Sequence, residues 1–86
     1  METFNATKET QTLVIEKGKT YQLDNVLILA INEGDIRWSI NDFAEDNEGK
    51  PAFTQWEYKF SANRTVFVKS NSEIKDAVIQ IDTIIP

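Results

Sequence analysis

Residues 26–31 have the sequence Val26-Leu27-Ile28-Leu29-Ala30-Ile31, an unbroken apolar run of mostly branched side chains. A run this short cannot span a membrane, and branched side chains favour a strand over a helix. Continuous apolar sequence of this length is typical of a strand buried on both faces. We therefore predict that residues 26–31 form the central strand of the fold.

A turn and a second apolar pattern follow this run. Residues 32–35 are Asn32-Glu33-Gly34-Asp35, and these residue types tolerate turn and left-handed conformations. Residues 36–40 then alternate between apolar Ile36, Trp38 and Ile40 and polar Arg37 and Ser39. Alternation is typical of a strand with one face in solvent. The pattern predicts a hairpin between residues 26–31 and 36–40.

The rest of the chain shows the same strand signature. Residues 11–15 and 20–23 flank a glycine-bearing turn at residues 16–19, which predicts a first hairpin. Asp24-Asn25 is predicted to break the chain before the central run. Further strands are predicted over residues 55–60, 65–70 and 77–82, with turns over residues 61–64 and 71–76. With about seven short strands and no helical period, the sequence predicts an all-β domain, a small antiparallel β-sandwich or jelly roll.

The two ends of the chain differ from the body. Residues 1–10 show no strand or helix period and predict an extended N-terminal arm, residues 11–83 the β-sandwich domain, and residues 84–86 a C-terminal tail. Phe4 is either an anchor that docks on the body or on a neighbouring subunit, or an isolated apolar residue of a loose tail. Ile84 and Ile85 would be exposed on a monomer, so we expect them to bind a partner. We expect the same of Phe4 if it docks on a neighbouring subunit.

Composition limits the classes of partner. The chain has 86 residues, 14 of them acidic and 9 basic, with a net charge of −5 and no cysteine or histidine. Negative charge opposes attraction to a phosphate backbone, so we expect no nucleic-acid partner. Residues 1–5 lack the features of a secretory signal, and we expect the mature chain to begin at Met1 and to have no membrane partner. A domain this small, without disulfides or metal staples, is expected to gain support from association with copies of itself.

The chain lacks the side chains that most often carry catalysis. Without histidine or cysteine we expect no enzyme activity, no catalytic residue, no metal site and no cofactor. Residues 16–20 superficially resemble the end of a phosphate-binding loop, but the upstream glycine is missing, so we interpret them as a turn. The long loop over residues 41–54 carries four carboxylates whose spacing does not match a calcium-binding loop, which favours a solvated acidic loop: Asp42, Glu45, Asp46 and Glu48.

Three aromatic residues allow two interpretations. Trp38, Trp56 and Tyr58 each alternate with polar neighbours, as core aromatics do, and a small fold needs large side chains inside. Exposed aromatic faces on a β-scaffold are also a recurrent way to bind flat ligands. Core packing is the favoured interpretation, and ligand-facing aromatics are the alternative.

The order of these segments resembles the accessory β-sandwich proteins of tailed-bacteriophage heads, necks and tails. The matching segments include a Leu-Val-Ile-x-Lys-Gly-Lys-Thr-Tyr-x-Leu stretch and a Thr-Val-Phe-Val-Lys-Ser strand, and they cover most of the chain: Leu13–Leu23, Val26–Gly34, Ile36–Ile40, Gly49–Pro51 and Thr65–Ile81. The resemblance implies a virion protein, assembled in the cytoplasm of a bacterial host. It also implies a homo-oligomer that binds capsid, neck or tail proteins.

Three functions from different classes follow as expectations. The first is a non-enzymatic structural component of a phage particle that joins copies of itself and other virion proteins through sheet edges and termini. The second is a small acidic inhibitor of a host defence protein, acting through carboxylates between Glu33 and Glu48. The third is a carbohydrate-binding module that uses Trp38, Trp56 and Tyr58.

Overall fold

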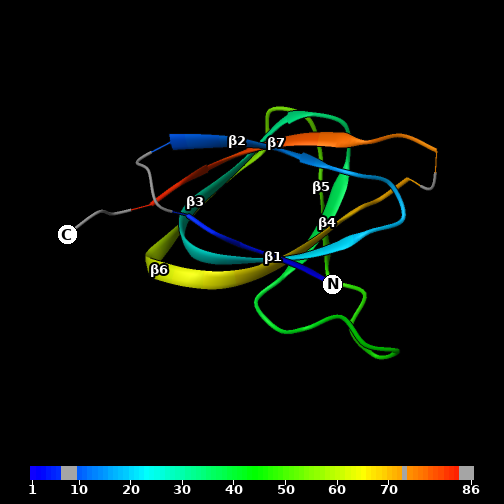
Figure 1. Ribbon diagram of the computed structural model, residues 1–86, viewed down its shortest axis with the longest axis horizontal. Helices are drawn as coiled ribbons and strands as arrows, with labels where there is room; N and C mark the ends of the chain where they lie inside the picture. The colour runs from blue at the N-terminus through cyan, green and yellow to red at the C-terminus, as the bar shows by residue number, and fades with distance from the viewer. Residues whose placement is uncertain (7–9, 73, 84–86) are drawn as a thin grey trace.

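The computed structural model describes residues 1–6, 10–72 and 74–83, which form an all-β domain (Figure 1). Its strands are β1 (Glu2–Asn5), β2 (Thr10–Ile15), β3 (Thr20–Glu33), β4 (Ile36–Ser39), β5 (Lys50–Ala52), β6 (Glu57–Ser70) and β7 (Ala77–Asp82). The described residues contain no helix, and hence none long and apolar enough to cross a membrane. The predicted all-β class is confirmed, and the finer assignment to a sandwich or jelly roll stays a prediction.

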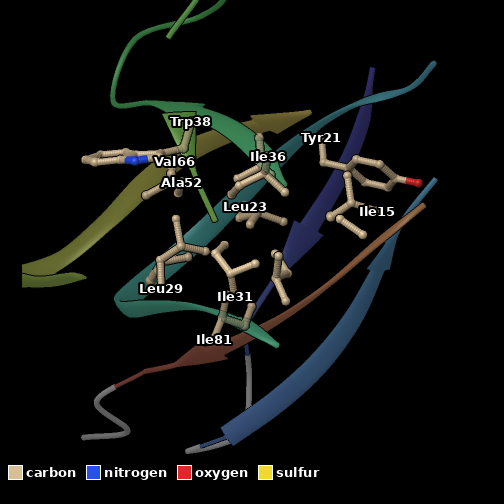
Figure 2. Close-up of a cluster of buried hydrophobic side chains, with 14 of the residues drawn as sticks. Ile15, Tyr21, Leu23, Leu29, Ile31, Ile36, Trp38, Ala52, Val66 and Ile81 are labelled. Carbon is tan, nitrogen blue, oxygen red and sulfur yellow. The ribbon is translucent and has the colours of Figure 1, made fainter. Parts of the chain in front are cut away.

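All seven strands belong to one hydrogen-bonded sheet. Their order is β2-β7-β3-β6-β4-β5, and β1 pairs separately with β3. β1 runs parallel to β3, and the other neighbouring strands are antiparallel. Buried side chains from β2 to β7 belong to a single cluster, so the sheet curls around one core (Figures 1 and 2).

β3 is the centre of this sheet, as predicted, but it is a 14-residue strand and extends well beyond residues 26–31. Its residues 21–24 pair with β1, and its residues 28–33 pair with β7. β6 pairs with β3 along both of these stretches. Because β6 occupies one edge of β3, β1 and β7 lie in succession along the other edge.

A β-bulge lets β3 bend between its two halves. The register with β6 shifts between Leu23 and Val26, and Asn25 has a φ of 62°. Asparagine tolerates this left-handed conformation better than most residues, and a bulge bends the strand that carries it. The predicted break at Asp24-Asn25 is therefore wrong: these residues bend one strand and do not separate two.

β6 corrects the sequence prediction in the same way. The turn predicted over residues 61–64 lies inside the 14-residue strand β6, which joins the strands predicted over residues 55–60 and 65–70. Between the pairs Val26–Arg64 and Ile28–Lys59, β6 has three more residues than β3. This bulge curves β6 outward and follows the bend in its partner (Figure 1).

Neither predicted hairpin forms. The turn over residues 16–19 is confirmed, with Lys19 N donating to Glu16 O at 3.2 Å, but β2 then pairs with β7 and not with β3. Gly34 likewise turns the chain, with a φ of 84°, but β4 pairs with β5 and β6 and not with β3. The physical reason is shared: β6 and the succession of β1 and β7 already occupy both edges of β3.

Two short strands were not predicted. β1 lies within the predicted arm, and its Ala6 neighbour is buried and donates its N–H to Asp24 O at 3.0 Å. Residues 2–6 are thus part of the sheet and not a separate arm. β5 lies in the predicted long loop and forms a hairpin with β4, in which Pro51 is paired with Arg37.

The core forms on one face of the curled sheet. Val26, Leu29 and Ile31 are buried, whereas Leu27, Ile28 and Ala30 are only partly buried, so the prediction that both faces of residues 26–31 are buried is wrong. Figure 2 shows the labelled apolar side chains converging from several strands. The largest fully buried side chains are Ile15, Leu23, Leu29, Ile31, Ile36, Ile79, Ile81, Val26, Val66 and Val68.

The two glycines at Gly18 and Gly49 give a matched test of this architecture. Both have positive φ, at 75° and 78°, so alanine at either position costs about 1–2 kcal/mol in backbone strain. A Cβ at Gly18 meets nothing within 4 Å, whereas at Gly49 it lies 2.7 Å from Trp38 O and from Phe43 Cε1. We expect Gly49→Ala to lower the free energy of unfolding by about 3 kcal/mol or more.

Urea unfolding of both variants provides the measurement, with Gly18→Ala as the control for backbone strain alone. Equal losses of stability for Gly18→Ala and Gly49→Ala would contradict the close approach of Gly49 to β4.

Candidate functional site

An aromatic cluster joins β4 to β6. The Trp38 ring lies 5.5 Å from Trp56, 5.3 Å from Tyr58 and 5.7 Å from Phe60, measured between ring centroids. The Trp56 and Tyr58 rings are nearly parallel, at 15° and 5.9 Å. Alternation along β6 and the residue just before it places the side chains of Trp56, Tyr58 and Phe60 on one face, as the sequence predicts. Trp38 anchors the cluster from the neighbouring strand.

The cluster is half core and half surface. Trp38 and Phe60 are each only 6% exposed, and Trp56 is partly buried against the core. Tyr58 is 44% exposed, so the favoured interpretation of it as a core aromatic is wrong. The reason is its position, because β4 pairs with β6 only from residue 67 onward and leaves the strand around residue 58 uncovered on that side. Tyr58 covers Trp38 and presents the rest of its ring to solvent.

A pocket of about 410 Å³ opens beside this cluster. It lies between the end of β4, the loop that follows it, and the outward curve of β6. The lining residues are Trp38, Ser39, Ile40, Asn41, Asn47, Gly49, Lys50, Tyr58, Phe60 and Arg64. Aromatic rings, hydroxyl and amide groups and two cations therefore face one space, and none of the described lining residues carries a carboxylate.

The two cations of this pocket have no carboxylate partner within the described part of the chain. The ion pairs found there involve Lys19, and neither Lys50 nor Arg64 takes part in one. Lys50 Nζ lies 5.8 Å from the centroid of the Trp38 ring, within the range of a cation–π contact. The cationic charge at this pocket is thus not neutralised by a neighbouring side chain.

Trp38 also carries an unused hydrogen-bond donor. Its indole Nε1–H is buried and has no hydrogen-bond partner among the described residues. Leaving such a donor unpaired costs about 1–3 kcal/mol. Figure 2 shows that the Trp38 ring points away from the other labelled core side chains, on the outer side of the core.

Asn47 organises the acidic loop beside the pocket. Its Nδ2 donates to Asp42 O at 2.9 Å and to Ser39 Oγ at 3.1 Å, and its Oδ1 accepts from Gly49 N at 3.3 Å. Backbone hydrogen bonds between Asn47 and Ala44 close the tip of the loop. The loop is therefore ordered from within, and its four predicted carboxylates at residues 42, 45, 46 and 48 are exposed.

These carboxylates do not gather around a common point. Over the described residues, no group of three or more acidic side chains is arranged to hold a metal ion. The prediction of a solvated acidic loop agrees with their exposure.

A second pocket, of about 320 Å³, has cations that are already engaged. Lys19 Nζ lies 2.7 Å from Glu16 Oε2, and this hydrogen bond and charge raise the pKa of Lys19, as does Glu2. Arg37 donates to Gly49 O at 3.0 Å, and Lys69 Nζ lies 4.4 Å from the centroid of the Phe43 ring. These contacts stabilise the fold and leave this pocket a weaker candidate than the aromatic one.

The two edge strands of the sheet differ in how readily another strand could pair with them. β5 is a three-residue strand, Lys50-Pro51-Ala52, and both its length and its proline discourage further pairing. β2 is a six-residue strand, Thr10-Gln11-Thr12-Leu13-Val14-Ile15, without charge, proline or glycine. Within the described ranges, β2 pairs with β7 on one side and is the last strand of the sheet on the other. The sequence and length of β5 therefore oppose further pairing, whereas those of β2 do not.

The predicted partner-binding residues are only partly described. Phe4 lies in β1, partly buried and packed against the core, so it docks on the body of its own chain. Its contact with a partner stays a prediction. Ile84 and Ile85 lie outside the described residues.

Sequence reasoning missed the two cations of the aromatic pocket, Lys50 and Arg64. They are 14 positions apart in the sequence and line the same pocket because β4 pairs with β5, which carries Lys50, and with β6, which carries Arg64. One signal in the sequence could have pointed to these cations: neither Lys50 nor Arg64 has an acidic residue immediately before or after it.

Comparison of the chain with protein-family models, with curated proteins and with solved structures finds no match.

Asn47 and Asn41 provide a matched test of the loop beside the pocket. Asn47→Ala removes the hydrogen bonds that the side chain makes to Asp42, Ser39 and Gly49, and we expect a loss of about 1–3 kcal/mol in the free energy of unfolding. We also expect faster amide exchange in residues 41–49, because the loop loses its internal support. Asn41→Ala is the control, since only main-chain groups of Asn41 enter these bonds. Equal effects of the two substitutions would contradict the role of Asn47.

Proposed function

We propose that this chain is a non-enzymatic structural protein that assembles with copies of itself by pairing β2 of one copy with β2 of another. The observation that carries the proposal is that β2 is the last strand at one end of the sheet formed by the described residues, and that it carries no charge, proline or glycine. An open strand edge presents unpaired N–H and C=O groups and serves as a template for another strand. The absence of histidine and cysteine from the chain supports a role without catalysis.

The side chains of β2 suit such pairing. Thr10, Thr12 and Val14 are exposed on one face, and Val14 is 54% exposed. Val14 is paired with the partly buried Val78 of β7, so the outer face near the edge carries an apolar pair. β-branched residues stabilise cross-strand contacts, and charge on the strand would oppose them.

The symmetry of the contact follows from using the same strand twice. Antiparallel pairing of two β2 strands is a two-fold contact that closes on itself and gives a dimer. It would continue the sheet from one copy into the next and satisfy the backbone groups of both edges.

The larger assembly that we propose is the virion of a tailed bacteriophage, on the basis of the resemblance in segment order described above. In this proposal the chain binds a capsid, neck or tail protein in addition to its own copies.

Charge placed on β2 tests the edge. Thr12→Lys with Val14→Lys puts two ammonium groups on the exposed face of each strand, where like charges oppose one another across a two-fold seam. We expect the association constant of the full chain, measured by sedimentation, to fall by at least about tenfold while the circular dichroism spectrum is retained.

The control carries the same added charge elsewhere. Phe53→Lys with Ile74→Lys replaces side chains that are 54% and 77% exposed and lie outside the strands. The proposal is wrong if the wild-type chain is a monomer at all accessible concentrations, or if the control dissociates the oligomer as strongly as the β2 variant.

The proposed virion role is tested separately, by asking whether the chain is present in purified particles. Mass spectrometry of purified phage particles from the source of the sequence should detect the chain at a fixed stoichiometry with the major structural proteins. Its presence in infected cells but not in the particles would contradict a virion role and leave the β2 contact to be judged by sedimentation.

A further inference from the structure

We propose that the aromatic pocket beside Trp38 and Tyr58 binds a sugar ring that carries a carboxylate. This site is separate from the proposed assembly edge, because none of its lining residues lies in β2. A volume of about 410 Å³ lies in the range of pockets that hold small molecules, and mixed aromatic and polar lining is typical of them.

The charge of the pocket selects an anion. Lys50 and Arg64 line it without an ion-pair partner in the described part of the chain, although the chain as a whole has a net charge of −5. Cations that remain unpaired in an acidic protein form a local positive region. A carboxylate is the complementary group, and guanidinium and ammonium both bind it through charge-assisted hydrogen bonds.

The aromatic surface selects a ring with an apolar face. Tyr58 presents 44% of its surface to solvent, backed by the buried Trp38 ring at 5.3 Å. A sugar ring exposes C–H groups on its flat faces, and these pack against the negative face of an aromatic ring. Trp56 lies parallel to Tyr58 at 5.9 Å, toward a neighbouring pocket that Trp56 lines, so a second ring of a chain could follow the first.

The hydrogen-bonding groups select a ligand rich in acceptors. Ser39 Oγ accepts from Asn41 N and from Asn47 Nδ2, which leaves its own O–H free to donate. Asn41, whose side chain carries an amide donor, also lines the pocket. Hydroxyl and carboxylate oxygens of an acidic sugar can accept from such donors.

The acidic loop disfavours a polyphosphate ligand. The exposed carboxylates of residues 42–48 belong to the same loop as the lining residues Asn41 and Asn47. Closely spaced phosphates would be repelled by them, whereas a single carboxylate per ring can be held at Lys50 and Arg64. These observations favour an acidic sugar over a nucleotide.

Nuclear magnetic resonance titration of the full chain tests the proposal. The chain has two tryptophans, so the two indole N–H signals can be assigned with one Trp56→Phe variant. We expect galacturonic acid to shift the Trp38 indole signal, and galactose, which lacks the carboxylate, to bind about tenfold more weakly. An oligogalacturonate that binds more tightly than the monomer and also shifts Trp56 identifies a polysaccharide as the source, whereas equal affinity identifies the free sugar acid.

Three variants locate the interaction. Tyr58→Ala should abolish the shift, and Lys50→Gln with Arg64→Gln should reduce the preference for galacturonic acid over galactose to about one, since the charge is removed and a polar side chain is kept. Phe53→Ala, which removes another exposed aromatic ring, is the control and should bind as the wild type does.

Four results would overturn the proposal. They are no shift of Trp38 with galacturonic acid at millimolar concentration, equal affinity for galactose, unchanged binding by Tyr58→Ala in a folded protein, and tighter binding of a nucleoside monophosphate than of galacturonic acid. The oligomeric state enters none of these measurements, so they stand whether or not β2 mediates assembly.

Discussion

The pairing capacity of β3 is the constraint on which the structure depends. A strand has two edges, and β3 fills one with β6 and the other with β1 and β7 in succession. Its neighbours in sequence, β2 and β4, must therefore pair elsewhere: β2 with β7, and β4 with β5 and β6. This arrangement places β2 at one end of the sheet and β5 at the other. The unequal protection of these two ends is the basis of the proposed assembly.

The sequence predicted the local conformation well and the pairing poorly. Alternation and branched side chains located the body of the sheet, and Gly18 and Gly34 marked real turns. The hairpins failed because a turn shows that two strands are connected, not that they are adjacent, and the edges of β3 are filled by segments distant in sequence. Asp24-Asn25 was misread because the same residue types favour a loop and a bulge.

In the aromatic pocket, too, the local pattern was predicted from the sequence and the tertiary arrangement was not. Sequence alternation predicted the shared face of Trp56, Tyr58 and Phe60, and their contacts with Trp38 follow from it. The exposure of Tyr58 depends on where β4 stops pairing with β6, which no local pattern encodes. Lys50 and Arg64 line the same pocket only because β4 lies between β5 and β6 in the sheet. The same aromatic cluster therefore contributes buried rings to the core and the exposed ring of Tyr58 to the pocket.

The claim that β2 is the open edge of a sheet completed by a second copy is tested most directly by amide hydrogen exchange at two protein concentrations. Alternate amides of β2 point away from β7 and lie at the edge of the sheet. The account predicts that these amides exchange rapidly in dilute protein and become protected as concentration rises, while those at the outer edge of β5 remain unprotected at both. Rapid exchange along the outer edge of β2 at every concentration, with an oligomer present, would contradict it.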